Sequence, residues 1–270
     1  MAYKAFWLLL IAGAVAWLVP ELWQWLRRRQ VSRQPLSASA LQVIELSLPP
    51  WKKMPAELRE QLTGRIRQFL AEKNFEGCGG LIMTEEIRLT IAAQACLLLL
   101  NRKIRCYPKL ETILVYPTAY RDQQKHLINT AERDERTKAG ESWQSGNVVL
   151  AWDHVVAGVT NYADGHNVTF HEFAHQLDQD DGVADGTPVL PHTSYATWAR
   201  VFKHEFEALI EEVRKGHRTV LDAYGTQNPA EFFAVATEAF FEKPRQLRLK
   251  HPELYFELSQ YYRVDPIKWL

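Results

Sequence analysis

The spacing of apolar side chains along the chain predicts mainly helices. Between residues 55 and 74, apolar positions such as Leu58, Leu62, Ile66 and Phe69 recur every three or four residues, which is typical of an amphipathic helix. Similar runs of apolar residues, with Thr84 and Asn228 as N-caps, predict the remaining helices. These helices are expected over residues 84–100, 168–177, 195–215, 228–242 and 252–262.

Two short apolar runs predict strands, over residues 112–116 and 148–152. Residues 41–48 are also compatible with an extended stretch, while residues 121–139 are charged and irregular and predict a solvated loop. The expected fold class is therefore α+β, mainly helical, with a small sheet. The strand at 148–152 could pair with an extended substrate as an edge strand, or it could be an ordinary interior strand.

The N-terminus predicts one hydrophobic helix ahead of this domain. Residues 5–19 carry no charge, and the apolar run resumes after Pro20 and Glu21. Counted to residue 26, the helix would be about 33 Å long, enough to span a bilayer. The arginines at 27–29 follow the span, which favours a C-terminal domain in the cytoplasm. We therefore expect a single-pass anchor in the inner (cytoplasmic) membrane.

Two alternatives to the anchor stay open. The stretch around Ala14 and Ala16 resembles the cleavage site of a secretory signal peptide, and a soluble amphipathic helix would leave the protein cytoplasmic. The domain division favoured by the sequence is an anchor over residues 1–30, a linker over 31–50 and the main domain over 51–270.

Composition supports a folded domain and excludes one class of partner. The 270 residues are 47% hydrophobic and 11% aromatic, enough for one sizeable core. Lys plus Arg and Asp plus Glu both number 32, so the chain lacks the positive charge of a nucleic-acid binder. Three cysteines, Cys78, Cys96 and Cys106, make no disulfide framework and fit a reducing compartment.

The sequence His171-Glu-Phe-Ala-His175 carries the candidate chemistry. On a helix, its two histidines point the same way and can bind Zn²⁺, while Glu172 lies where it can take a proton from an activated water. The alternative is a surface helix with solvated histidines. The apolar neighbours Phe173 and Leu177 favour a buried helix instead, and buried imidazoles and carboxylates need a partner such as a metal.

A catalytic zinc site needs a third protein ligand. The helix predicted after Asn228 carries Glu231 and Glu238 on one face, seven residues apart. Glu231 is the preferred ligand, although its position also suits a capping box; Glu238 is the alternative ligand, or a residue that supports one. Tyr224 could stabilise a developing oxyanion or simply pack beneath a loop, and the residues alone leave both possibilities open.

Several acidic side chains follow the H-E-x-x-H segment. Asp178 could orient a ligand or brace a neighbouring loop, whereas Asp180, Asp181 and Asp185 are best explained as solvated loop residues. The sequence does not place Asp153 and His154, which follow the second predicted strand.

Several longer motifs together resemble the Mlc titration factor A family of bacterial zinc-dependent peptidases, from about residue 51 to residue 266. The motifs are Glu76-Gly-Cys-Gly-Gly80, Thr90-Ile-Ala-Ala-Gln-Ala-Cys96, Gly140-Glu-Ser-Trp143, Gly165-His-Asn-Val168 and the segments 171–178 and 228–241.

The resemblance implies a zincin-like metallopeptidase domain with a gluzincin-like site. One Zn²⁺ per chain would be bound by His171, His175 and Glu231, with Glu172 as the general base and Tyr224 as the transition-state tyrosine. It further implies aminopeptidase activity on small peptide substrates and, for enterobacterial members, binding to the transcriptional repressor Mlc. The alternative to a working peptidase is a latent or weakly active module that binds and sequesters a regulatory protein.

Overall fold

The computed structural model describes residues 26–102, 104–118 and 146–269, together with the single residues Tyr3, Val19 and Trp23. Nearly all of the apolar run on which the predicted anchor and signal peptide rest lies outside these residues. The predicted loop at 121–139 and the motif at 140–143 lie outside them as well. Within the described part of the chain, no helix is both long and apolar enough to cross a bilayer.

The sheet has three parallel strands in the order β1-β2-β3. They are β1 (Asn74–Gly77), β2 (Thr112–Tyr116) and β3 (Asn147–Ala151). The sequence predicted β2 and, within one residue, β3, but it missed β1. Trp152 is not part of β3, because it begins the next helix. In the described residues β3 lies at an edge of the sheet, whereas its pairing with a substrate stays a prediction.

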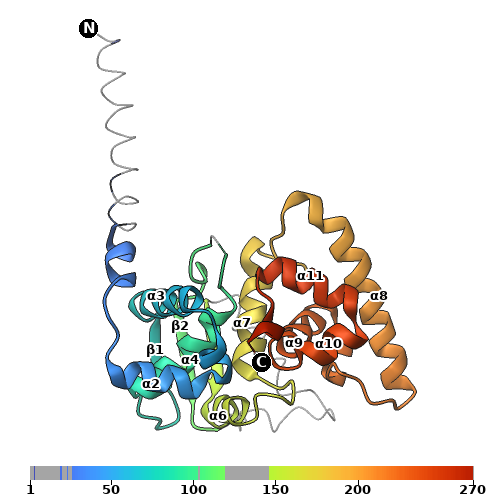
Figure 1. Cartoon of the computed structure of the whole chain (residues 1–270), viewed down its shortest axis with the longest axis horizontal. Helices are drawn as coiled ribbons and strands as arrows, with labels where there is room; N and C mark the ends of the chain where they lie inside the picture. The colour runs from blue at the N-terminus through green and yellow to red at the C-terminus, as the bar shows by residue number, and fades with distance from the viewer. Residues whose placement is uncertain are drawn as a thin grey trace, which may run out of the picture.

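Helices make up most of the remaining structure (Figure 1). The α-helices are α2 (Ala38–Ser47), α3 (Ala56–Glu72), α4 (Glu85–Leu97), α6 (Trp152–Thr160), α7 (Val168–Asp178), α8 (Tyr195–Arg214), α9 (Pro229–Glu242), α10 (Pro244–Lys250) and α11 (Pro252–Tyr262). The short 3-10 helices are η1 (Pro49–Lys53), η3 (Gln179–Asp181), η4 (His192–Ser194), η5 (Ala223–Thr226) and η6 (Pro266–Lys268). The mainly helical α+β class with a small sheet is confirmed.

The extended stretch allowed at residues 41–48 is wrong, because residues 41–47 belong to α2 and Leu48 is its C-cap. The Ser37 side chain accepts a hydrogen bond from the Ala40 amide and starts the helix. Ile44 and Leu48 are then fully buried, and the Ser47 hydroxyl lies 2.9 Å from that of Thr90 in α4. This part of the expected linker is therefore packed against the domain.

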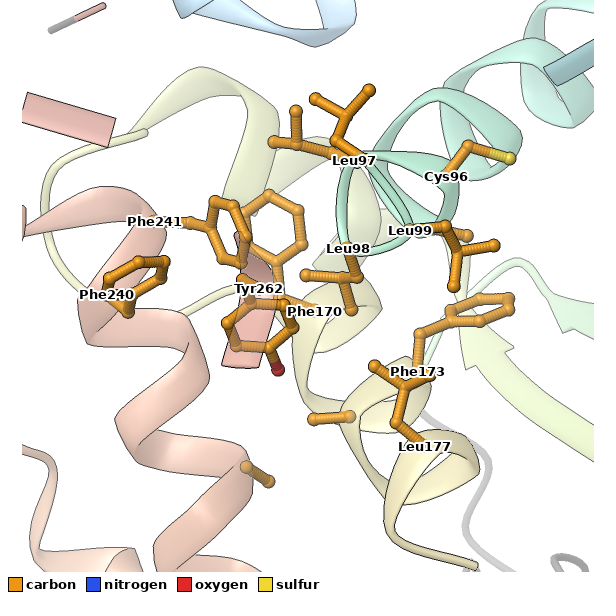
Figure 2. Close-up of a cluster of buried hydrophobic side chains, with 14 of the residues drawn as sticks. Cys96, Leu97, Leu98, Leu99, Phe170, Phe173, Leu177, Phe240, Phe241 and Tyr262 are labelled. Carbon is orange, nitrogen blue, oxygen red and sulfur yellow. The ribbon is translucent and has the colours of Figure 1, made fainter. Parts of the chain in front are cut away.

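Helix α7 lies between two groups of elements. In Figure 1, the sheet and α2 to α4 lie on one side of it, and α8 to α11 lie on the other. Its apolar face packs against both groups, as Figure 2 shows. Phe173 lies 4.8 Å from Tyr107 between ring centroids, and Phe170 lies 5.3 Å from Phe241 of α9.

Burial of each such side chain stabilises the fold by roughly 1.5–3 kcal/mol. Phe170, Phe173 and Leu177 all point into this core, and none is more than 4% exposed. Because α7 is held from both sides, the polar residues on the same helix are fixed in space. This rigidity matters for any site that α7 carries.

Candidate metal centre

Two histidines of α7 come together as the sequence predicted. The Nε2 atoms of His171 and His175 lie 3.2 Å apart, and both side chains are buried. The start of α7 sets their position, because the Asn167 side chain accepts a hydrogen bond from the Phe170 amide. This cap was not predicted from the sequence, although an Asn before an apolar helix is a recognisable signal.

Glu231 reaches the two histidines from α9. One of its carboxylate oxygens lies 2.9 Å from Nε2 of His171 and 3.4 Å from Nε2 of His175. The Asn228 side chain caps α9 by accepting a hydrogen bond from the Glu231 amide, at 3.0 Å. The backbone of Glu231 therefore takes part in the cap, while its side chain turns to the histidines instead of closing a capping box.

These three side chains could hold a metal ion. The distances between their donor atoms are 2.9, 3.2 and 3.4 Å. A tetrahedral zinc ion, with bonds of about 2.0–2.1 Å, separates its ligand atoms by roughly 3.3 Å. The observed spacing thus lies within a few tenths of an ångström of that needed. Two imidazole nitrogens and one carboxylate oxygen also form a donor set typical of catalytic zinc.

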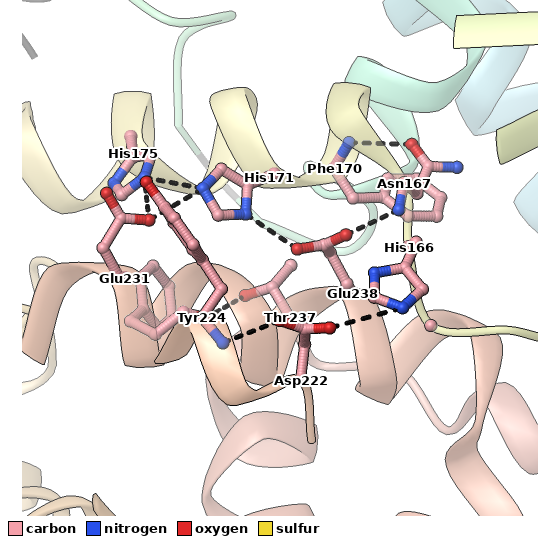
Figure 3. A network of polar contacts seen from close by, with 12 residues as sticks. His166, Asn167, Phe170, His171, His175, Asp222, Tyr224, Glu231, Thr237 and Glu238 are labelled. Carbon is pink, nitrogen blue, oxygen red and sulfur yellow. Dashed lines mark hydrogen bonds and ion pairs between the residues drawn. The ribbon is translucent and has the colours of Figure 1, made fainter. Parts of the chain in front are cut away.

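Glu238 lies one step behind this triad (Figure 3). Its carboxylate accepts a hydrogen bond from Nδ1 of His171 at 2.7 Å, and its other oxygen accepts one from the Asn167 amide at 2.5 Å. An imidazole whose Nδ1–H is held by a carboxylate presents its Nε2 lone pair to a metal. Glu238 therefore fits the supporting role that the sequence allowed, and it is not part of the donor triad.

Glu242 continues this support at the next turn of α9. Its carboxylate accepts hydrogen bonds from the Gly165 amide and from the side-chain amide of Asn167. Burial raises the pKa of Glu242 to about 8, although these two hydrogen bonds oppose the shift. Glu242 was not predicted from the sequence, because nothing in the local pattern shows that the segment before α7 lies against α9.

The protonation states of the triad follow from burial and close contact. Burial lowers the pKa of His175 to about 4, which leaves its imidazole neutral at pH 7. Burial opposes a charge on His171 too, but Glu238 and Glu231 outweigh it and raise that pKa to about 10. The two histidines lower the pKa of Glu231 to about 2 against the effect of burial. A cation entering the triad would therefore displace a proton from His171.

The predicted catalytic residues lie close to the triad. Glu172 is buried on α7, and its negative charge contributes to the raised pKa of the adjacent His171. Tyr224 lies in η5, with its ring centroid 5.9 Å from that of His171. Figure 3 shows its side chain extending from η5 towards His175 and Glu231. The structure thus brings all five candidate residues together, while their roles stay predictions.

Among the acidic residues at the end of α7 and after it, Asp178, Asp181 and Asp185 have local structural roles. Asp178 accepts a hydrogen bond from the Gly186 amide at 2.9 Å, so it braces the loop after α7. Asp181 and Asp185 accept hydrogen bonds from amides two residues further along, as expected of turn residues. Asp153 and His154 lie exposed in the first turn of α6 and are not part of the donor triad.

A buried H-E-x-x-H helix that meets a glutamate from a second helix is an arrangement typical of a metallopeptidase. The chain belongs to the glucose-regulated metallo-peptidase M90 family, whose model matches residues 22–263. It is a metallopeptidase-family protein by this match, and the predicted family resemblance is confirmed.

Curated relatives support the same assignment. An uncharacterized protein of Synechocystis sp. is 39% identical over 266 residues, which cover 96% of each chain. The Mlc titration factor A of Pectobacterium atrosepticum is 30% identical over 227 residues, covering 82% of this chain and 85% of its own length. That of Klebsiella pneumoniae subsp. pneumoniae is 29% identical over 231 residues, covering 82% and 85%.

Proposed function

We propose that this protein is a zinc-dependent peptidase that hydrolyses peptide bonds with one Zn²⁺ per chain. The observation that carries the proposal is the convergence of three buried donor atoms, from His171, His175 and Glu231, at 2.9–3.4 Å from one another. When bound there, zinc supplies Lewis acidity, which polarises a carbonyl and makes water acidic enough to attack at neutral pH.

Residues of the chain transfer the protons and stabilise the negative charge that develops on the substrate carbonyl. Glu172 takes a proton from the attacking water and delivers it to the leaving amine. Tyr224 donates a hydrogen bond to the oxyanion that develops on the substrate carbonyl. Glu238 keeps the proton on Nδ1 of His171, so that Nε2 faces the metal.

We propose small peptides with a free amino terminus as the substrate class, since the resemblance to the Mlc titration factor A family points to an aminopeptidase. An extended substrate would pair with β3, which lies at an edge of the sheet among the described residues. Cleavage of peptides whose amino terminus is blocked would establish an endopeptidase instead.

The proposal is tested with a panel of aminoacyl reporters and internally quenched peptides. The full chain is assayed as purified, after chelation, and after zinc is restored. We expect hydrolysis that chelation abolishes and zinc restores, with aminoacyl reporters preferred. The control variant Glu253→Gln changes an exposed carboxylate on α11 and should match the wild type. Hydrolysis that persists after complete zinc removal would overturn the metal-dependent mechanism.

A second proposed activity is binding to a transcriptional repressor. The relatives named Mlc titration factor A support it, because their printed name links them to Mlc. In this alternative the chain sequesters a repressor resembling Mlc and has weak or latent hydrolysis. A pull-down with wild type and Glu172→Gln separates the two activities: equal capture without cleavage indicates sequestration, whereas capture by the variant and cleavage by the wild type indicates proteolysis.

We also propose that residues 1–30 anchor the protein in the inner membrane, with the peptidase domain in the cytoplasm. Support comes from the uncharged run at residues 5–19 and the three arginines that follow the span. Alkaline carbonate washing of membranes tests the anchor, because an integral protein stays in the pellet. Recovery in the wash would favour the cytoplasmic alternative.

A further inference from the structure

The carboxylate of Asp222 connects two segments that border the metal centre (Figure 3). One oxygen accepts a hydrogen bond from the backbone amide of Tyr224 at 2.7 Å. The other lies 3.3 Å from Nε2 of His166, which precedes α7. Asp222 therefore touches both the turn that carries Tyr224 and the segment that leads into the H-E-x-x-H helix.

The turn that carries Tyr224 also packs against α8 and α9. Gly225 packs so closely on α8 and α9 that an added Cβ would lie 3.2 Å from Leu209 and 3.4 Å from Val235. This contact fixes how closely η5 lies against the two helices. The contact does not fix the start of the turn, where the Asp222 side chain caps the Tyr224 amide.

The segment that carries His166 is held on both sides of that residue. The amide of Gly165 donates to Glu242, and the amide of Asn167 donates to Glu238. Both acceptors belong to α9, so the backbone at 165–167 is a fixed reference next to the metal centre. Through His166, Asp222 is tied to that reference.

The contact between His166 and Asp222 contributes little to folding stability. The two side chains are 59% and 31% exposed, and ion pairs at such positions are strongly screened by water. The contact instead orients the Asp222 carboxylate, because it keeps the second oxygen of Asp222 turned to His166 while the first oxygen caps η5. The effect of Asp222 should therefore appear in the placement of Tyr224 rather than in the melting temperature.

We propose that Asp222 is a positioning residue that sets the place of Tyr224 relative to the metal centre, with His166 as its partner. This inference rests on the proposed function, in which Tyr224 donates to the oxyanion. Such a donor is effective only within about 2.7–3.1 Å of the developing charge. A displacement of roughly 1 Å can cost about a hundredfold in rate.

The kinetic test is a double-mutant cycle in the full chain, with zinc content matched. Asp222→Ala should lower kcat by roughly 10- to 100-fold with KM within twofold. Asp222→Asn keeps an oxygen for the Tyr224 amide and should restore most of the loss. In a Tyr224→Phe background, Asp222→Ala should cost less than a further twofold. If the two losses multiply in full, Asp222 does not act through Tyr224 and the inference is wrong.

Asp181→Ala is the matched control for the kinetic test. Asp181 accepts a hydrogen bond from the amide two residues further along, as Asp222 does, but it lies in the loop after α7. Its loss removes the same kind of turn contact away from Tyr224. We expect kcat within twofold of the wild type. A loss equal to that of Asp222→Ala would show that the rate responds to any weakened turn, which contradicts the inference.

A second readout does not depend on hydrolysis. The chain is labelled with 3-fluorotyrosine, and the Tyr224 resonance is assigned by its absence in Tyr224→Phe. Zinc should shift this resonance in the wild type and in Asp222→Asn but not in Asp222→Ala. An unchanged zinc response in Asp222→Ala would overturn the inference. If the wild type hydrolyses no reporter, the proposed function fails, while this spectrum still decides whether Asp222 places Tyr224.

Discussion

Replacement of Glu238 by Gln should weaken zinc binding without unfolding the protein. The Glu238 carboxylate accepts two hydrogen bonds, one from Nδ1 of His171 and one from the Asn167 amide. A glutamine amide has a single acceptor oxygen, so its NH₂ group must face one of these two donors. Either His171 loses the partner that orients it, or the start of α7 loses a backbone contact.

The size of the effect follows from that geometry. Removal of a carboxylate that orients a metal-bound histidine typically costs 10- to 100-fold in metal affinity. This corresponds to about 1.4–2.7 kcal/mol of binding free energy. Glu238 is only 6% exposed, so solvent screens the contact weakly and we expect the upper half of that range.

The assay is competition for zinc against a chromophoric chelator at pH 7.5, with the fold checked by circular dichroism. Glu253→Gln, on the surface of α11, is the control for a Glu-to-Gln change that touches no part of the site. We expect the dissociation constant of Glu238→Gln to exceed that of the control by about 30- to 100-fold. A value within threefold of the wild type would refute the supporting role of Glu238.

Three further predictions concern the elements that hold the site. Burial raises the pKa of Asp178 to about 7, so the folded state keeps a proton that the unfolded chain releases above about pH 4. Asp178 should therefore contribute a fall on the order of 2–4 kcal/mol to the free energy of unfolding between pH 4 and pH 7. In urea titrations, the difference between wild type and Asp178→Asn, whose amide stays neutral, should change by this amount across the window, and a constant difference would contradict the shift. Gly186→Ala should lower both the melting temperature and the zinc affinity. The φ angle of Gly186 is +80°, and a Cβ there would overlap the Pro229 carbonyl oxygen at the start of α9. A melting temperature unchanged in calorimetry would contradict this close approach. Asn228→Ala removes the side chain that caps the Glu231 amide and should cost about 1 kcal/mol in urea unfolding, whereas Asn228→Asp should retain most of it.

Local sequence signals predicted the elements that carry the chemistry. The caps at Thr84 and Asn228 are both present, and α7 has the length expected from its apolar flanks. The spacing of His171 and His175 placed both imidazoles on one face, because i and i+4 positions are neighbours on any helix. The residues alone already favoured Glu231 over Glu238 as the third ligand, the family resemblance implied the same ligand, and the structure brings Glu231 into the donor triad.

What the sequence could not provide depends on contacts between distant segments. The contacts of Asn167 with Glu242 and of His166 with Asp222 have no spacing signature, because each joins segments that lie far apart along the chain. Residues 41–48 were ambiguous because a short apolar run fits a strand as well as a helix. The Ser37 cap and the packing of Ile44 against the core decide in favour of the helix.

The most direct test of the account compares the wild type with Glu172→Gln in reporter hydrolysis, at equal zinc content. Glu172 lies on α7 but is not one of the three candidate ligands, so the variant should bind zinc as the wild type does. We expect one zinc per chain in both proteins and a loss of at least a hundredfold in kcat for the variant. Turnover retained by Glu172→Gln at the same zinc content would show that Glu172 is not the general base of a zinc-dependent hydrolysis.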